Sequence, residues 1–200
     1  MVLTEKNFLN NLKSLKSAKE LPKVKRYFTE KTKDDKFIGI RMAAIFKLAK
    51  QYSEMEHSEV LKLLRSEFYE ARMGAVSIMD FQARKKNATS ERKKALFEMY
   101  IHNHQWINNW DLIDRSAPYV IGGYLYDKPR NILYKLAKSK NIWERRTAIV
   151  STYFFIRQND LADTFKIAEI LRNDQQDLIQ RAVGSWIREA GKNRFKNIDI

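Results

Sequence analysis

Arg72-Met-Gly-Ala-Val76 belongs to a weak internal repeat in which an Arg is followed by small and aliphatic residues. The pattern occurs five times in the 200 residues, as Arg41-Met-Ala-Ala-Ile45, Arg72-Met-Gly-Ala-Val76, Arg115-Ser-Ala-Pro-Tyr119, Arg146-Thr-Ala-Ile-Val150 and Arg181-Ala-Val-Gly-Ser185. The separations between successive Arg residues are 31, 43, 31 and 35 residues. Recurrence at about 20 to 50 residues is typical of proteins built from stacked structural repeats.

The residue pattern favours helices as the repeating elements. Apolar residues recur at helical spacing, as in Val60-Leu-Lys-Leu-Leu64, and no segment alternates as a strand would. The separations suit two-helix HEAT repeats, and the small residues would let the second helix of each pair pack closely on its neighbours. The sequence therefore predicts an all-α, HEAT-like helical-repeat solenoid, an α-α superhelix that forms a single domain over residues 1–200. Second helices would line a concave basic groove, although five such matches could also arise by chance.

The charge of the chain favours a polyanionic partner. Thirty-eight Lys and Arg against 24 Asp and Glu give a formal net charge of +14. Such an excess attracts nucleic acid, although it could also serve only solubility. The Arg residues near the starts of second helices are candidate DNA contacts, or else structural ion pairs: Arg41, Arg72, Arg115 and Arg181.

Composition also limits the kinds of site that the chain can hold. There is no Cys, so disulfides and thiolate metal sites are excluded. The three His, which are His57, His102 and His104, lack supporting ligands, so we expect no metal and no cofactor. No run of about 18 apolar residues occurs, and we expect a soluble, cytoplasmic monomer without a membrane segment.

The densest unusual stretch is Gln105-Trp-Ile-Asn-Asn-Trp-Asp-Leu-Ile-Asp-Arg115. Asp111 and Asp114 are three residues apart, and Trp110 precedes Asp114 by four, so all three share one face of a helix. An aromatic ring beside a carboxylate is a recognisable site geometry. By itself Asp114 could equally be an acid that pairs with an Arg, and Trp110 could be a core residue.

In this segment and four others the chain resembles the HEAT-like-repeat DNA alkylation repair glycosylases, the AlkD-like family. The matching segments appear in the expected order and are Phe37-Ile-Gly-Ile-Arg41, Tyr69-Glu-Ala-Arg72, Trp110-Asp-Leu-Ile-Asp114, Trp143-Glu-Arg-Arg146 and Arg188-Glu189. The Trp-Asp-x-x-Asp segment is the most specific of them. They extend over residues 37–189.

The resemblance implies a glycosylase that excises cationic N3- and N7-alkylated purines from double-stranded DNA, with the lesion left stacked in the duplex. We expect it to be monofunctional, because no Lys in the site segment could act as a Schiff-base nucleophile. An alkylated purine is already positively charged, so the enzyme needs chiefly to stabilise an oxocarbenium-like sugar and to position water. The implied catalytic residues are Asp114 for that role and Trp110, which would pack against the deoxyribose. Arg146 would contact the adjacent phosphate as a DNA-binding residue. Further DNA contacts are predicted at Tyr27, Arg188 and Trp186.

One departure from the family pattern concerns the last matched helix. The family usually has Gly-Trp-x-Leu-Arg-Glu there, whereas this chain has Gly184-Ser-Trp-Ile-Arg-Glu189, which moves the Trp by one residue and about 100° around the helix. Either Trp186 is a core residue and half of the aromatic clamp is missing, or the site is arranged differently. The alternatives to a glycosylase are a catalytically silent relative that binds bent, branched or damaged DNA, and a helical-repeat adaptor for an acidic protein.

Overall fold

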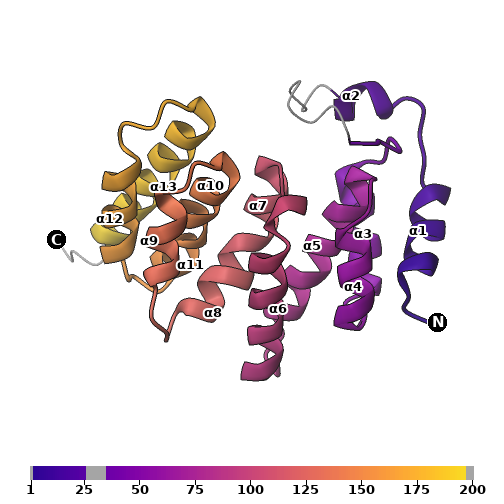
Figure 1. Ribbon diagram of the computed structural model, residues 1–200, viewed down its shortest axis with the longest axis horizontal. Coiled ribbons are helices and arrows are strands. Elements are labelled where there is room, and N and C mark those ends of the chain that lie inside the picture. Colours follow the sequence, from indigo (N-terminus) through magenta and orange to yellow (C-terminus); the bar gives the residue numbers. More distant parts are fainter. Residues whose placement is uncertain (1, 26–34, 197–200) are drawn as a thin grey trace. The chain divides into compact units, whose positions relative to one another are not determined.

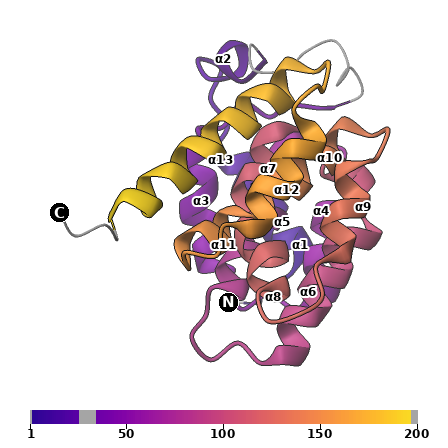
Figure 2. The same cartoon turned by 90° about the vertical axis from the view of Figure 1, so that its left-hand side faces the viewer.

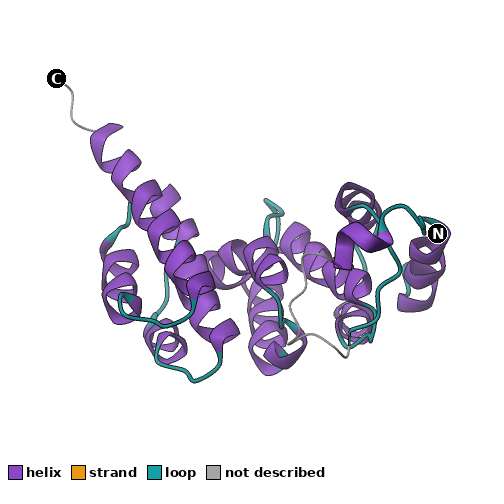
Figure 3. Cartoon of the chain, turned by 90° about the horizontal axis from the view of Figure 1, so that it is seen from above, coloured by secondary structure: helices purple, strands orange, loops and turns teal. Residues whose placement is uncertain are grey.

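A computed structural model describes residues 2–25 and 35–196 (Figure 1). These residues form helices and loops without a strand (Figure 3), and one isolated backbone bridge joins Lys36 to Phe68. Successive helices pack in a repeat-like arrangement, which confirms the predicted all-α helical-repeat class. No helix within the described ranges is both long and apolar enough to cross a membrane.

The chain divides into two compact units, Met1–Asn108 and Asn109–Ile200. That the whole chain acts as one domain, with one concave groove, stays a prediction. The described helices of the first unit are α1 (Glu5–Ser14), α2 (Leu21–Lys25), α3 (Met42–Gln51), α4 (His57–Leu64), α5 (Tyr69–Ala83) and α6 (Ser90–His102). Those of the second are α7 (Trp110–Ala117), α8 (Gly123–Leu125), α9 (Asn131–Ala137), α10 (Ile142–Ser151), α11 (Tyr153–Arg157), α12 (Ala162–Leu171) and α13 (Asp177–Lys196). A π-helical turn, Pro118–Gly122, joins α7 to α8.

Helix α5 is the centre of the first unit, and it packs against α1, α3, α4 and α6. Nearly every residue from Tyr69 to Gln82 is buried, including several that are polar. Gly74 lets α1 approach closely, because a Cβ at this position would overlap the ring of Phe8. The small residues of the repeat thus permit close helix packing, as the sequence predicts.

The segment Phe37–Arg41 is held against α5 by a buried carboxylate. Glu70 is fully buried, and its Oε1 accepts hydrogen bonds from the backbone N–H of Ile38 at 3.1 Å and of Gly39 at 2.8 Å. Gly39 has a φ of 87°, and a Cβ there would lie 2.8 Å from the Cβ of Leu21. Both the backbone angle and the close approach therefore require glycine. Two of the motifs that carry the family resemblance meet here and have a structural role.

Arg72 is buried in the first unit and does not face solvent. Its Nη2 lies 2.7 Å from Asp35 Oδ1, and its Nη1 donates to the carbonyl of Ser66 at 3.1 Å. Only 2% of the Arg72 side chain is exposed. Of the two roles that the sequence leaves open for Arg72, the structural ion pair is confirmed and the DNA contact is wrong. Arg41, by contrast, is 74% exposed and pairs with Glu20.

Helix α10 is the corresponding centre of the second unit, and it packs against α7, α9, α12 and α13 (Figure 2). Residues Arg146–Ser151 are all buried within it. Arg146 and Arg181 lie in the early turns of α10 and α13, as expected from the repeat. Arg115 lies near a helix start too, because α7 begins at Trp110 and continues past Ala117 into the π-helical turn.

A polar network closes the side of the second unit where α9 meets the α11–α12 connection. Arg130 Nη1 lies 2.7 Å from Asp160 Oδ2 and 2.6 Å from Asp163 Oδ2, and its guanidinium carbon is 3.9 Å from the centre of the Phe155 ring. The hydroxyl of Tyr134 donates to Asp163. Burial, then the hydrogen bond to Asp163, raises the pKa of Tyr134 from 10.0 to about 12.

This network should make the stability of the protein fall at high pH. Because the folded protein favours the neutral phenol, the stabilisation by Tyr134 is complete below pH 10 and is lost as the pH rises from 10 to 12. The difference in unfolding free energy between wild type and Tyr134→Phe should shrink over that window by on the order of 2 kcal/mol. Urea denaturation at a series of pH values measures it, with Tyr126→Phe as the control on an exposed ring. A difference that stays constant to pH 12 would contradict the assignment.

Candidate functional site

The first turn of α7 presents polar and aromatic side chains on one face. Leu112, Ile113, Ser116 and Ala117 are buried, which leaves Trp110, Asp111 and Asp114 on the partly exposed side. The helix begins at Trp110, where the side-chain oxygen of Asn109 accepts from the Trp110 N–H at 2.9 Å. Trp110 and Asp114 are therefore neighbours one turn apart on the same face, as the sequence predicts.

Asp114 is held by a two-point ion pair with Arg146 of α10. Arg146 Nε donates to Asp114 Oδ1 at 3.0 Å, and Nη2 donates to Oδ2 at 2.8 Å. Arg146 Nη1 donates to the carbonyl oxygen of Leu178 in α13 at 2.7 Å. Parallel hydrogen bonds of this kind fix the plane of a carboxylate as well as its position. The guanidinium thus joins Asp114 to both α10 and α13.

Other Arg–Asp pairs in the described residues provide a comparison for Asp114, and one of them, Arg130 with Asp160, has a carboxylate that is likewise 33% exposed. Arg72 pairs with Asp35 in the first unit, and Arg145 pairs with Asp174 in the second. The carboxylates of Asp35 and Asp174 are 8% and 7% exposed, whereas that of Asp114 is 33% exposed. The Arg side chains are buried to a similar degree in the Arg72 and Arg146 pairs. Asp114 therefore combines a fixed position with access to solvent.

This geometry suits a carboxylate that acts on something outside the protein. An ionised carboxylate has acceptor sites on both oxygens, and Arg146 occupies one direction on each. The remaining directions can accept from a water molecule or face a positively charged group. The ring of Trp110, one turn before Asp114, is partly exposed beside it.

A family model described as DNA alkylation repair enzyme matches residues 8–198 of the chain. The chain belongs to this DNA alkylation repair family. The match confirms the family that the five sequence segments predicted. DNA alkylation repair is accordingly its general function, with DNA as the substrate. The comparison with curated proteins gave no match.

Trp186 of this DNA alkylation repair protein packs within the second unit. Its ring stacks on Tyr153 of α11, with ring centres 5.0 Å apart and an angle of 29° between the planes. The indole Nε1 is buried without a hydrogen-bond partner among the described residues. Ser185, which stands at the family's Trp position, is exposed. Trp186 therefore joins α13 to α11, which favours the core interpretation over a direct DNA contact.

The other predicted DNA contacts of this repair protein lie in different settings. Arg188 is exposed on α13, two residues after Trp186. Arg181 is exposed too and pairs with Asp177 one turn earlier at 2.7 Å. Tyr27 lies outside the described residues. No cluster of metal-ligating side chains occurs in the part of the chain that the structure describes.

The sequence leaves open that Asp114 pairs with an Arg, which the structure confirms, but two features of the site were not predicted: which Arg it is, and the backbone contact that this Arg makes. The pairing of Asp114 with Arg146 could have been found, because the two residues are 32 apart, close to one repeat period. The carbonyl of Leu178 carries no sequence signal, since every residue has one. Outside these two features, hydrogen bonding to Tyr153, then the nearby Tyr119, raises the pKa of Arg157, which lies beside Tyr153 of the Tyr153–Trp186 stack.

Proposed function

We propose that the chain is a monofunctional DNA glycosylase that removes cationic N3- and N7-alkylated purines from duplex DNA by hydrolysis of the N-glycosidic bond. The observation that supports it is the partly exposed Asp114 carboxylate, fixed by Arg146 and adjacent to Trp110, in a member of the DNA alkylation repair family. The net charge of +14 favours association with the DNA backbone.

The chemistry needs a fixed negative charge more than a proton donor. When the C1′–N bond breaks, its electron pair goes to the cationic purine, which leaves as a neutral base, and positive charge develops on the sugar. Asp114 stabilises that charge and accepts a hydrogen bond from a water molecule. The water oxygen bonds to C1′, and the proton that it loses passes to the carboxylate or to solvent. Trp110 packs against the deoxyribose and keeps bulk water away.

Arg146 has two candidate roles in this mechanism. The family resemblance predicts that it contacts a DNA phosphate. However, its side chain is only 9% exposed, and three of its five N–H donors are used by Asp114 and Leu178. We therefore propose that Arg146 acts first as a positioning residue, which holds the Asp114 carboxylate in the orientation that catalysis requires.

The salt dependence of DNA binding separates these roles. Arg146→Gln should reduce base excision about 10- to 100-fold by releasing Asp114, and it should leave the slope of log Kd against log salt unchanged. A phosphate contact would instead lower that slope by about one. Arg188→Gln is the matched control, because exposed Arg188 is a predicted phosphate contact and its loss should change the slope.

Arg146→Lys is the control for the possibility that Arg146→Gln loses activity only because the substitution disturbs the fold. It keeps the charge but loses the two-point geometry, so it should fold with a melting temperature near that of wild type and restore excision only in part. A wild-type excision rate in a folded Arg146→Gln protein would contradict the positioning role.

The direct test of the proposed function is release of methylated purine from alkylated duplex DNA by the purified protein. Detection of free N7-methylguanine or N3-methyladenine, above the rate of spontaneous depurination, is the expected result. An absence of release would refute the glycosylase proposal.

The packing of Trp186 on Tyr153 supports a second candidate, a silent relative that recognises damaged or bent DNA by charge and shape. Salt-dependent DNA binding without base release would identify that function. Failure to bind DNA even at low salt would contradict both candidates and favour the adaptor alternative.

A further inference from the structure

Glu20 of the first unit holds two exposed cations with one oxygen atom. Its Oε1 accepts hydrogen bonds from Lys23 Nζ and from Arg41 Nε, each at 3.0 Å. The Glu20 side chain is only 10% exposed, whereas those of Lys23 and Arg41 are 59% and 74% exposed. Hydrogen bonding from Lys23, then from Arg41, lowers the pKa of Glu20, so this carboxylate is ionised at neutral pH. A largely buried acid therefore fixes two cations that face solvent.

Both cations keep donors for a further acceptor. Glu20 uses only the Nε of Arg41, and Arg41 makes no other side-chain hydrogen bond within the described residues, so both of its Nη groups are available. In Arg72 and Arg146, by contrast, the Nη groups bond to backbone carbonyls and to an Asp. Because Lys23 Nζ and Arg41 Nε lie 3.0 Å from the same oxygen, the two positive groups are close enough to contact one phosphate.

The segments that meet at Glu20 carry a large excess of positive charge. Residues 14–25 and 37–51 contain seven Lys and Arg, and Glu20 is their only acid. Lys16 and Lys19 are exposed on the same segment as Glu20, and no ion pair joins either of them to another described residue. The first turn of α3, which follows Arg41, has no acid either. Glu20 therefore cancels one charge of the group and leaves it positive, which favours a polyanion as the partner.

The fold anchors this group of cations to the centre of the first unit. The N–H of Ser17 donates to the carbonyl of Gly39 at 2.9 Å, and the carbonyl of Ser17 accepts from the N–H of Glu20 at 3.1 Å. Gly39 is bound in turn by the buried carboxylate of Glu70 in α5, and Arg41 follows two residues later. The backbone on both sides of the ion pair is thus fixed before any ligand binds, which lowers the entropy cost of binding.

We propose that Lys23 and Arg41 together bind one phosphate of the DNA backbone. This inference rests on the proposed function, because the glycosylase must hold duplex DNA. The group is an exposed surface, so it suits a phosphate that other contacts along a strand keep in place, and a free phosphate ion is not the expected ligand. None of its residues belongs to the unit that contains Asp114. The contact would position the duplex without reading its sequence.

The salt dependence of duplex DNA binding by the full chain tests this site. Fluorescence anisotropy measures the affinity for unmodified duplex DNA at several salt concentrations for wild type, Lys23→Gln, Arg41→Gln and the double variant. Each single variant should lower the slope of log Kd against log salt by about one, as expected for one lost phosphate contact. Because both cations bind the same phosphate, the double variant should lose little more than either single variant. Unchanged slopes in the single variants, or losses that add in the double variant, would contradict the shared site.

Lys62→Gln is the matched control, because Lys62 is 64% exposed and likewise pairs with a less exposed Glu three residues earlier. It should leave the slope unchanged, and a loss as large as that of Lys23→Gln would overturn the proposal by showing that net charge alone governs binding. The melting temperature of each variant shows that it is folded. Release of methylated purine by wild type tests the glycosylase separately: reduced slopes without release would retain this site and refute the enzyme, and release with unchanged slopes would do the reverse.

Discussion

Asp114→Asn should lose about 10²- to 10³-fold of the excision rate of wild type while binding duplex DNA with the same affinity. The substitution keeps the size of the side chain and one oxygen acceptor, but it removes the negative charge that opposes the positive charge of the sugar in the transition state. Loss of one well-placed electrostatic group in an enzyme typically costs this much. Single-turnover base release from methylated duplex DNA measures the rate, and fluorescence anisotropy measures the affinity.

Asp111→Asn is the matched control for this prediction, because Asp111 is in the first turn of the same helix, whereas Asp114 is the carboxylate that pairs with Arg146. It should retain most of the excision rate. Full activity of Asp114→Asn, or equal losses in the two variants, would show that the chemistry does not depend on the carboxylate that Arg146 holds.

Arg72→Met should lower the free energy of unfolding by about 3–5 kcal/mol. The substitution fills similar space but leaves Asp35 without its countercharge in a buried position, and it leaves the carbonyl of Ser66 without a donor. Breaking one side of a buried ion pair has a cost of this size, because the remaining charge cannot be solvated. Urea denaturation at neutral pH measures the loss.

Arg41→Met provides the comparison, because Arg41 occupies the same place in the preceding repeat but its side chain is 74% exposed, and its partner Glu20 also pairs with Lys23 and so keeps a countercharge. Its loss should cost less than about 1 kcal/mol. In the double variant Arg72→Met with Asp35→Leu, removal of both charges should recover most of the stability. Similar losses for Arg41→Met and Arg72→Met would mean that burial does not govern the strength of these pairs.

The helical repeat could be predicted from the sequence because its signal is periodic. Small residues after each Arg predicted close packing, and Gly74 against Phe8 confirms it. The face of Trp110 and Asp114 could be predicted as well, since spacings of three and four residues define one side of a helix. The repeat does not predict the environment of each Arg. Arg41 and Arg72 share the sequence pattern, but Arg41 is exposed and Arg72 is buried.

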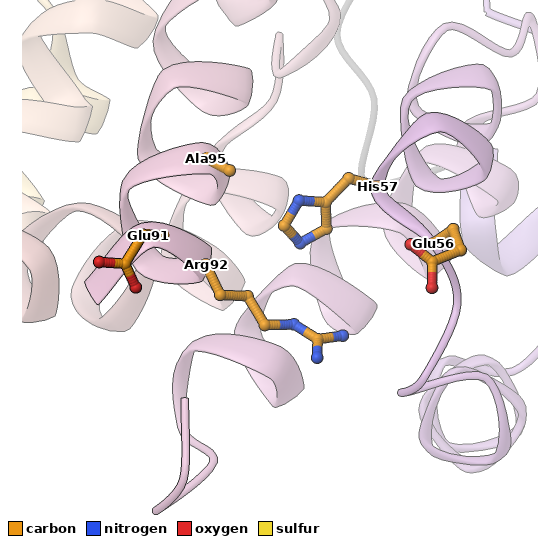
Figure 4. A pocket seen from close by; sticks show the side chains of 5 residues that line it. All are labelled: Glu56, His57, Glu91, Arg92 and Ala95. Carbon is orange, nitrogen blue, oxygen red and sulfur yellow. The ribbon is translucent and has the colours of Figure 1, made fainter. Parts of the chain in front are cut away.

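The features that were not predictable depend on contacts between distant segments. The role of Trp186 depends on Tyr153, a residue 33 positions earlier on another helix. The cavity that Glu56, His57, Glu91, Arg92 and Ala95 line (Figure 4) depends on how the starts of α4 and α6 pack together, and neither segment alone signals it.

The bond from Arg146 to the carbonyl of Leu178 makes the candidate active site depend on the second residue of α13. The first turn of a helix is where its ends fray, because those residues have the fewest helical hydrogen bonds. If that turn loosens, Arg146 loses one of its three anchors, and the direction of the Asp114 carboxylate is no longer fixed. If Asp114 acts as proposed, warming should abolish base excision before the core melts, and the stability of the first turn of α13 should decide how far apart the two temperatures lie.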